Sequence, residues 1–344
     1  MKRVIFVCLS LGGILFSLFA GGSGETSAGS GSTSLKVSIA HNQTSLENPY
    51  VNGANKFKEE LERLSGGTIQ VTTYHGTQGE NENELVEKME IGAIDIVVAS
   101  PGFMTSAGVK EVDLLSLPYL YNSYEHWTKA LDGNFGNEMK KIIAEKSGGR
   151  FQVLGYWTAA VRDYYGKKKV TKPSDLRGMS LRGQSAQVQQ DFWKACGAVP
   201  TSIAWGELYQ ALQQGVVDSA ENDYTNFMLK DHHKTPNGHF ISETHHDYTT
   251  RLMLTSGVFW NKLTDQQKNW ITQAAKTATE EERKVTIEMA EKSKAKVIAD
   301  GAEVTNFADV DIAAFRALAI PIQDKFAQEN NMTSLLDLVR TAGR

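Results

Sequence analysis

Cysteine is scarce in this chain, because its 344 residues include only Cys8 and Cys196. We expect Cys8 to be removed with an N-terminal export signal, which leaves no partner for a disulfide, and Cys196 to be an ordinary core residue. The glycine, serine and histidine spacings of phosphate loops, dinucleotide-binding turns, serine-nucleophile elbows and zinc proteases are also missing. These absences argue against disulfide stabilisation and against the common enzyme classes.

An excess of positive charge is missing as well. The formal net charge is −4, and removal of Lys2 and Arg3 from the 36 basic residues would leave 34 against 40 acidic residues. Nucleic acid is therefore not an expected partner, since its recognition needs a basic surface. An anionic ligand would have to be held by a few local arginines.

A long apolar run occurs only at the N-terminus. Lys2 and Arg3 precede a run that ends at Ala20, is short for a bilayer span and closes on small residues. We predict that residues 1–20 are a signal peptide and that the Gly-, Ser- and Thr-rich residues 21–34 are a flexible linker. The sequence thus predicts an exported, periplasmic protein whose fold begins near residue 35.

From residue 35 onward, the hydrophobic patterns of strands alternate with those of helices. The alternation restarts after Arg162, so we expect an α/β protein with two lobes, each with parallel strands covered by helices. The expected strands are residues 35–40, 68–74, 94–99, 151–156, 179–182 and 198–201, and the expected helices are residues 49–64, 80–91, 124–146, 186–196 and 206–214.

A much longer helix is predicted for residues 263–300. Thr264 and Gln267 form a capping box at its start, no Pro or Gly interrupts it, and Gly301 ends it. At ~1.5 Å per residue it would measure about 55 Å, so it can connect two lobes. We assign residues 35–158 with about 248–285 to lobe I, and residues 159–247 with about 286–340 to lobe II.

Histidine is concentrated in one segment of the chain. Adjacent side chains on a strand or helix point in different directions, so a pair such as His232 and His233 cannot easily hold one metal. We therefore predict neither a metal nor another cofactor. Two alternatives stay open: a metal site in this segment, or a secreted enzyme that uses His245 or His246 with Glu243 as acid and base.

Two arginines indicate a binding site for an anion. Arg162 follows the expected strand 151–156 and Arg182 ends the expected strand 179–182. In a parallel sheet both would project from the carboxyl edge, where α/β proteins bind ligands. A guanidinium offers a planar fork that matches the two oxygens of a carboxylate. Taken alone, however, either arginine is more often one half of a surface salt bridge.

The segments around these arginines resemble a known family, the solute-binding proteins of tripartite ATP-independent periplasmic (TRAP) transporters, or DctP-like proteins. The resemblance covers roughly residues 35–301. It is carried by residues 175–182 (DLRGMSLR), 206–218 (GELYQALQQGVVD) and 221–222 (EN), with lesser matches at 65–69 (SGGTI), 92–95 (GAID) and 117–120 (LPYL).

The resemblance implies a two-lobed periplasmic binding protein fold and roles for individual residues. Arg182 matches the arginine that makes a two-pronged bridge to the substrate carboxylate, and Arg162 matches the arginine that assists it. Asn222 matches the asparagine that helps to hold the carboxylate, and Trp205 matches the aromatic residue that packs on the ligand. From the other lobe, the positions that would select the substrate are Glu80, Ser100, His41 and Asn42.

Polar residues around this expected site indicate the class of ligand. Asp223 follows the EN pair where the family usually has Pro, and Gln184 stands where a Pro is common. With Asn42, Glu80 and the aromatic rings of Trp157 and Trp205, they suit the hydroxyls and ring of a sugar. We expect a sugar acid, a hexuronate or an aldonate. A dicarboxylate or another organic acid remains the alternative, although its second carboxylate would meet Glu80 and Asp223.

The resemblance also implies a mechanism. Cleft closure would capture a small organic acid without covalent chemistry, and the closed receptor would deliver it to the TRAP permease subunits in the membrane. We expect a monomer that is not an enzyme.

Overall fold

The computed structural model describes residues 34–79 and 81–342. The predicted signal peptide, the linker up to residue 33, and Glu80 lie outside the described residues. Within these ranges, no helix combines the length and the apolar character that a membrane span requires.

The described strands form one nine-stranded sheet in the order β2-β1-β3-β8-β4-β7-β5-β6, with β9 paired to β8. At its two ends the strands are parallel, as predicted. At its centre, however, β8 is antiparallel to β3 and β4, and β4 is antiparallel to β7. The expectation of parallel strands was therefore wrong for the centre. The strands are β1 (Leu35–His41), β2 (Ile69–His75), β3 (Ile96–Ala99), β4 (Phe151–Gly166), β5 (Ser180–Arg182), β6 (Val199–Thr201), β7 (Ser219–Asn222), β8 (Phe240–Ser256) and β9 (Glu303–Thr305).

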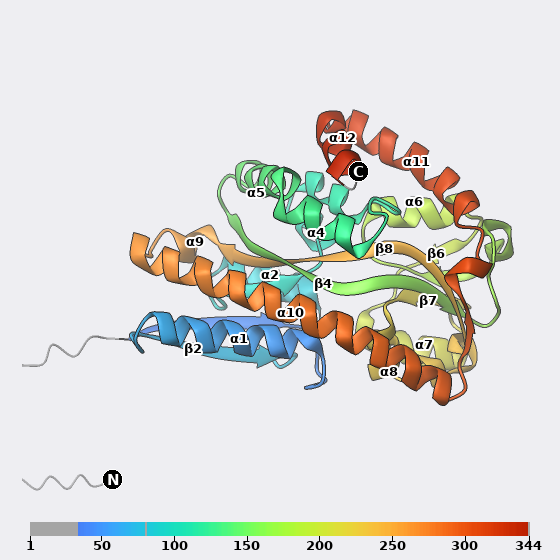
Figure 1. The fold of residues 1–344 in the computed structure, drawn as a ribbon, viewed down its shortest axis with the longest axis horizontal. Coiled ribbons are helices and arrows are strands. Elements are labelled where there is room, and N and C mark those ends of the chain that lie inside the picture. The colour runs from blue at the N-terminus through green and yellow to red at the C-terminus, as the bar shows by residue number, and fades with distance from the viewer. Residues whose placement is uncertain (1–33, 80, 343–344) are drawn as a thin grey trace, which may run out of the picture. The chain divides into compact units, whose positions relative to one another are not determined.

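The two long strands β4 and β8 cross the centre side by side (Figure 1). β4 continues to Gly166, whereas the sequence predicted an end at residue 156. The prediction failed because most of β4 is buried on both faces and its polar residues Arg162 and Asp163 are themselves buried. A strand of this kind shows no alternation of apolar and polar residues. Arg162 therefore lies within a strand and not beyond its end.

Helices form near the positions that capping residues indicate. α1 matches the predicted residues 49–64, because the Asn48 side chain accepts from the Tyr50 N–H and Pro49 occupies the first turn. The predicted helix 124–146 is two helices, since the backbone of Gly133 is extended. The helices are α1 (Pro49–Leu64), α2 (Glu82–Glu90), α3 (Gly102–Ser106), η1 (Lys110–Ser116), α4 (Tyr124–Asp132), α5 (Asn134–Lys146), η2 (Pro173–Leu176), α6 (Gln187–Ala195), η3 (Trp205–Glu207), α7 (Leu208–Gln214), α8 (Tyr224–Leu229), η4 (His232–Lys234), η5 (Pro236–Gly238), α9 (Gly257–Trp260), η6 (Phe307–Asp309), α11 (Ile312–Glu329) and α12 (Thr333–Ala342).

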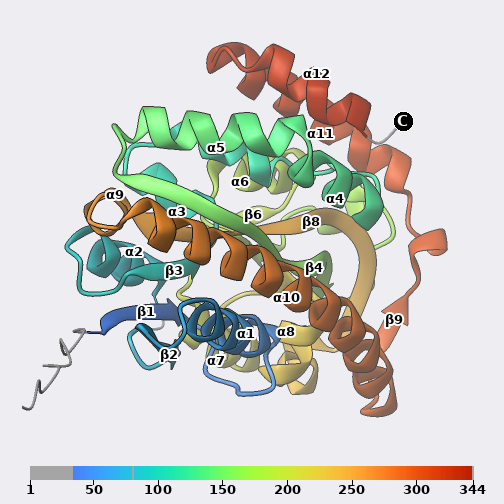
Figure 2. The same cartoon turned by 60° about the vertical axis from the view of Figure 1, so that its left-hand side comes forward.

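The long helix α10 (Asp265–Ala299) confirms the prediction closely. Thr264 and Gln267 form the capping box, and Gly301 follows the helix with a φ of 97°. Its 35 residues span about 52 Å at ~1.5 Å per residue. Along this length α10 contacts α1, β4 and α8, as Figures 1 and 2 show. It therefore connects elements from both halves of the sheet.

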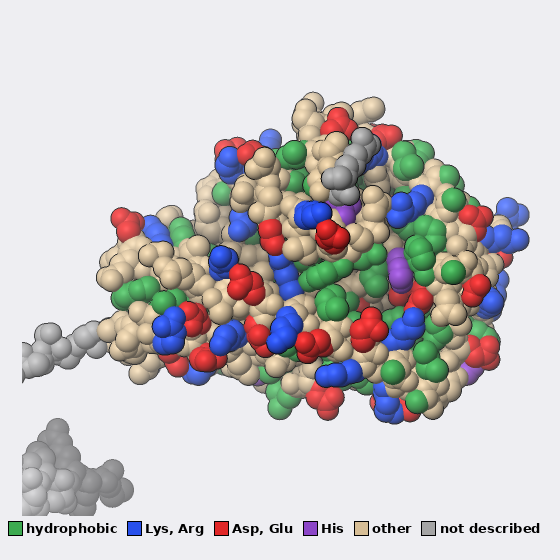
Figure 3. Space-filling model, in the orientation of Figure 1, with side chains coloured by type: hydrophobic (Ala, Val, Ile, Leu, Met, Phe, Trp, Pro, Cys, Tyr) green, Lys and Arg blue, Asp and Glu red, His purple; other side chains and the backbone are tan. Residues whose placement is uncertain are grey.

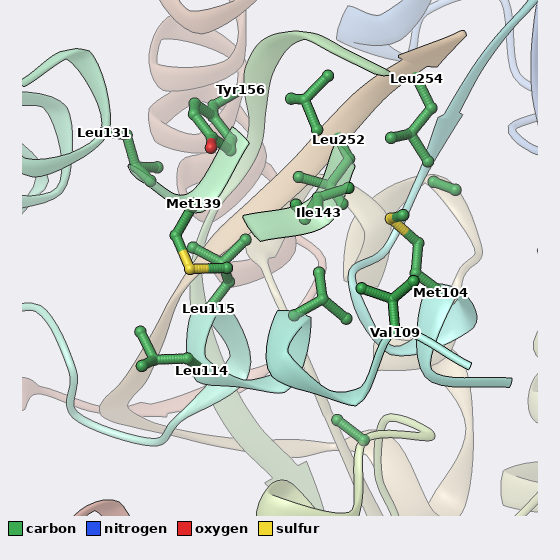
Figure 4. Close-up of a cluster of buried hydrophobic side chains, with 14 of the residues drawn as sticks. Met104, Val109, Leu114, Leu115, Leu131, Met139, Ile143, Tyr156, Leu252 and Leu254 are labelled. Atoms are coloured by element: carbon green, nitrogen blue, oxygen red, sulfur yellow. The ribbon is translucent and has the colours of Figure 1, made fainter. Parts of the chain in front are cut away.

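Apolar side chains form several clusters, and the largest of them contains residues of the first half together with Ala186 and Val188 of the second. Figure 4 shows part of this cluster, which includes Leu115 of η1, Met139 of α5 and Leu252 of β8. The C-terminal helix α12 joins this cluster through Leu335, Leu336 and Val339 and contacts α4 and α5. The expected extension of lobe II to residue 340 stays a prediction, and the contacts of α12 with α4 and α5 favour a place in lobe I. We propose that lobe I comprises residues 35–158, about 248–285 and α12, and that lobe II comprises residues 159–247 and about 286–332.

Candidate functional site

A cavity of about 580 Å³ lies where strand ends from the two halves meet. Its walls include Asn42 directly after β1, Ser100 directly after β3, Arg182 at the end of β5 and Asn222 at the end of β7. Each of these residues stands at or directly after the carboxyl end of its strand. The parallel strands of the two halves run in opposite directions, toward each other, so their carboxyl ends meet at the cavity. A volume of this size accommodates a small molecule, and the carboxyl ends of strands are where α/β proteins bind ligands.

The two halves touch each other beside the cavity. Gly102, at the start of α3, lies so close to lobe II that an added Cβ would stand 3.1 Å from Ser185 Oγ. Elsewhere Asn48 Nδ2 donates to Asn226 Oδ1 at 3.4 Å, and Lys230 Nζ donates to Thr44 Oγ1 at 3.2 Å. These contacts hold the halves together around the cavity.

Arg182 presents an unused hydrogen-bonding face to the cavity. Its Nε donates to the Ile203 carbonyl at 3.1 Å, and its guanidinium lies 5.7 Å from the centre of the Trp205 ring. Its two terminal nitrogens donate to no other residue in the described part of the chain. Burial lowers the pKa of Arg182, but an arginine in a protein keeps its proton. The geometry leaves the two-pronged edge available for a carboxylate.

Arg162 is held by its own partners. Its Nη2 donates to Glu221 Oε1 at 2.9 Å and to the Glu221 carbonyl at 2.7 Å, Nε contacts the other carboxylate oxygen, and Nη1 donates to Asn222 Oδ1 at 2.8 Å. Arg162 therefore forms a salt bridge, which is the more common role of an arginine, but this salt bridge is buried and not at the surface. A guanidinium has five N–H groups, and these contacts use four of them. One N–H group on Nη1 is therefore left for a ligand.

The carboxylate of Glu221 keeps its charge inside this site. Burial alone would raise its pKa, but the charges and hydrogen bonds of Arg162 and His246 outweigh that effect and lower it to about 2. His246 Nε2 lies 3.1 Å from Glu221 Oε2. Arg162 and Glu221 therefore form a buried ion pair in which the two charges balance.

The structure brings most of the other predicted residues to the cavity. Asn42, Ser100, Gln184, Trp205 and Asn222 all line it. Gln184 Nε2 also donates to Asp247 Oδ2 at 2.8 Å, and the indole N–H of Trp205 is buried with no hydrogen-bond partner among residues 34–79 and 81–342. Amides, a hydroxyl and an indole ring therefore surround the arginines.

Three predicted residues lie elsewhere. Asp223 caps α8 by accepting from the backbone and side-chain nitrogens of Asn226, at 2.9 and 2.7 Å, and does not line the cavity. His41 Nε2 lies 2.9 Å from His75 Nδ1 behind the wall, and burial lowers the pKa of His41 to about 3. Trp157 belongs to the core, where its indole N–H donates to Thr279 Oγ1 at 3.1 Å.

Sequence reasoning missed several residues of the cavity wall, among them the ion pair of Arg251 and Glu82. Arg251 Nη1 donates to Glu82 Oε1 at 3.3 Å, and Glu82 Oε2 accepts from the Ser100 N–H at 2.8 Å. Both side chains are almost completely buried. One signal in the sequence could have indicated Arg251, because it directly precedes the apolar residues 252–254 of a strand. A charged side chain in such a strand is buried and needs a partner.

The histidines of the segment 232–246 do not converge. His232 Nδ1 lies 2.8 Å from the Tyr165 hydroxyl, His233 lies 3.2 Å from Asp300, and His245 stacks on Phe307. Among residues 34–79 and 81–342, no three His, Cys, Asp or Glu side chains are placed to hold a metal ion. This segment instead makes separate structural contacts.

The molecular surface offers little long-range attraction for an anion on the face seen in Figure 3. Acidic and basic side chains are interspersed there, over α1 and α10. Recognition of an anion must therefore come from the arginines of the cavity itself.

Comparison with known proteins agrees with this geometry. A family profile described as bacterial extracellular solute-binding protein, family 7 (DctP), matches residues 39–330. The C4-dicarboxylate-binding periplasmic protein DctP of Rhodobacter capsulatus is 27% identical over 285 residues, which cover 82% of this chain and 84% of that protein.

Solved structures of TRAP periplasmic solute-binding proteins share the fold. The Sulfitobacter protein with bound β-D-galacturonate has a TM-score of 0.81 and 27% identity, and the match covers 89% of this chain and 99% of that one. The Chromohalobacter salexigens protein with bound D-glucuronate has a TM-score of 0.82 and 26% identity, with the same coverage. The two-lobed fold of these proteins is therefore also the fold of this chain.

Proposed function

The chain belongs to the DctP family of bacterial extracellular solute-binding proteins, and from that premise we propose that it is the receptor of a TRAP transporter for a sugar acid, a hexuronate or an aldonate. The single observation that carries this proposal is the position of Arg182. Its terminal nitrogens face a cavity of about 580 Å³ beside the ring of Trp205. A guanidinium with two free parallel donors binds a carboxylate in two places at once, and an adjacent indole packs on a sugar ring.

The remaining wall residues suit a hydroxylated ligand. Asn42, Ser100, Gln184 and Asn222 offer amide and hydroxyl groups that can donate or accept hydrogen bonds. An aliphatic acid would leave several of these groups unpaired when the cleft closes, which costs free energy. The solved relatives with bound D-glucuronate and β-D-galacturonate support this ligand class.

Closure of the two lobes would capture the ligand. β4 and β8 connect the lobes, and their pairing shifts register between Thr158 and Val161, where Ala160 has a φ of 61°. Such an irregular segment is a natural hinge. The carboxylate would bind Arg182 first, and polar groups of lobe I would then stabilise the closed state. The closed receptor would dock on the membrane permease and release its ligand unchanged.

The proposal includes the expected location and state. The receptor would be exported by a signal peptide that is cleaved near Ala20, act in the periplasm as a monomer and catalyse no reaction.

A C4-dicarboxylate is the second candidate ligand, because the relative from Rhodobacter capsulatus is a C4-dicarboxylate-binding protein. The lining residues separate the two candidates. Arg162 and Arg251 are already paired with Glu221 and Glu82, so Arg182 is the arginine that is free to pair with a ligand carboxylate.

Calorimetry on the mature protein tests the proposal, with D-glucuronate, D-galacturonate, D-gluconate, succinate and L-malate as ligands. We expect a sugar acid to bind, and Arg182→Ala to weaken it at least ~100-fold, because a buried charge pair loses one partner. Arg177→Ala is the matched control, since Arg177 is exposed on the same segment. Tight binding of succinate alone, or equal effects of the two substitutions, would refute the proposal.

A further inference from the structure

Arg251 and Glu82 form a second charged pair in the wall of the cavity that also contains Arg182. Arg251 belongs to the long strand β8 and Glu82 to the first turn of α2. Both residues line the cavity, and they are only 7% and 4% exposed. Neither residue is explained by the carboxylate clamp.

The hydrogen bonds of this pair are incomplete. Arg251 donates to Glu82 from Nη1 alone, and no hydrogen bond joins its other terminal nitrogen, Nη2, to a residue in the described part of the chain. Glu82 accepts from Arg251 on one oxygen and from the Ser100 N–H on the other, and each carboxylate oxygen can accept once more. The pair thus offers a donor and an acceptor side by side.

The charge of the pair restricts which group can bind there. Besides Glu82, the ionisable groups with a direct electrostatic effect on Arg251 include Tyr50 and Asp223. A second carboxylate of a ligand could accept from Arg251, but it would lie beside the carboxylate of Glu82, and two like charges in a buried site repel strongly. A hydroxyl can accept from Arg251, and a neighbouring hydroxyl can donate to Glu82. Two adjacent hydroxyls therefore match the pair, whereas a carboxylate does not.

We propose that Arg251 and Glu82 form a subsite that binds a pair of adjacent hydroxyls and excludes a second carboxylate, so that the receptor selects polyhydroxy monocarboxylates over diacids. This inference rests on the proposed function, since it takes the ligand carboxylate to be bound at Arg182. In this proposal Glu82 determines specificity through its charge. Arg251 is the hydrogen-bond donor, and Glu82 orients it.

The test compares the monocarboxylate D-glucuronate with the diacid D-glucarate, in which a second carboxylate replaces the aldehyde carbon that closes the pyranose ring of glucuronate, by calorimetry at pH 7. The wild-type protein should bind D-glucuronate about 100-fold more tightly, which corresponds to ~2.8 kcal/mol. In Glu82→Gln, which keeps the shape but removes the charge, that preference should fall at least ~10-fold. Glu84→Gln, an exposed residue of the same helix turn, should keep the wild-type preference.

A comparison of ligands on the wild-type protein covers the case in which Glu82→Gln does not fold. Hexanoate has one carboxylate and no hydroxyls, so it should bind at least ~100-fold more weakly than D-glucuronate. Equal affinity for D-glucuronate and D-glucarate, or equal preferences in Glu82→Gln and Glu84→Gln, would overturn the subsite while sugar-acid binding stands. Binding of no sugar acid by the wild-type protein would overturn both proposals.

Discussion

Gly102 lies where lobe I meets lobe II, and a larger side chain there should hinder closure. An added Cβ would stand 3.1 Å from Ser185 Oγ and 3.3 Å from Ala186 N. Gly102→Ala places one carbon in this tight space, whereas Gly102→Leu adds three more carbons to it. Overpacking of this kind costs about 1–3 kcal/mol. Only the closed state bears the cost, because the lobes separate when the cleft opens.

The expected result is a loss of affinity without a loss of fold. A cost of 1–3 kcal/mol in the closed state corresponds to a Kd that rises about 5- to 150-fold in Gly102→Leu. Calorimetry with the best sugar acid measures the Kd, and small-angle scattering with saturating ligand should show a less compact protein than wild type. Gly102→Ala should change the Kd less than ~5-fold.

The ligand-free melting temperature is the control, since Gly102 is at the start of α3 and a helix position tolerates Leu well. It should stay near the wild-type value. A wild-type Kd for Gly102→Leu would refute the closure contact. A fall in ligand-free stability as large as the loss in binding energy would show that the contact persists without ligand.

Three further predictions concern buried charges. Glu221→Gln should lower the free energy of unfolding by about 3–5 kcal/mol in urea titrations, because it leaves Arg162 unpaired, whereas Glu125→Gln on an exposed pair should cost less than ~1 kcal/mol. The pKa of Glu221 is lowered from 4.5 to about 2, so its stabilisation is present above pH 4.5 and is lost as the pH falls toward 2. The lost part is on the order of 3 kcal/mol, and an equal acid dependence in Glu221→Gln would contradict this. Burial raises the pKa of Glu282 to about 8, so the unfolded chain loses this proton first and stability should fall as the pH rises from 4.5 to 8. In Glu282→Gln that fall should disappear, and an unchanged slope would show that another group causes it.

Local signals in the sequence predicted several elements almost to the residue. Asn48 and Pro49 mark the start of α1, and Thr264, Gln267 and Gly301 delimit α10. These signals work because capping and helix termination depend on a few neighbouring residues. A signal that depends on distant contacts failed: β4 was predicted ten residues too short at its C-terminal end.

The candidate site divides in the same way. A sequence pattern pointed to Arg182, Asn222 and Trp205, and the structure places all three in the cavity wall. The same reasoning included Trp157, which lies in the core, because an aromatic residue looks alike in a core and in a binding site until its neighbours are known.

The sequence by itself determined the boundaries of α1 and α10, the alternation of strands and helices, and the arginine that lines the cavity, because each depends on residues that are close together along the chain. Only the tertiary structure decided which charges are paired. Arg162 meets Glu221 across 59 positions and Arg251 meets Glu82 across 169, and such distances leave no periodic trace in the chain. Pairing of these two arginines is what leaves Arg182 as the arginine that is open to a ligand.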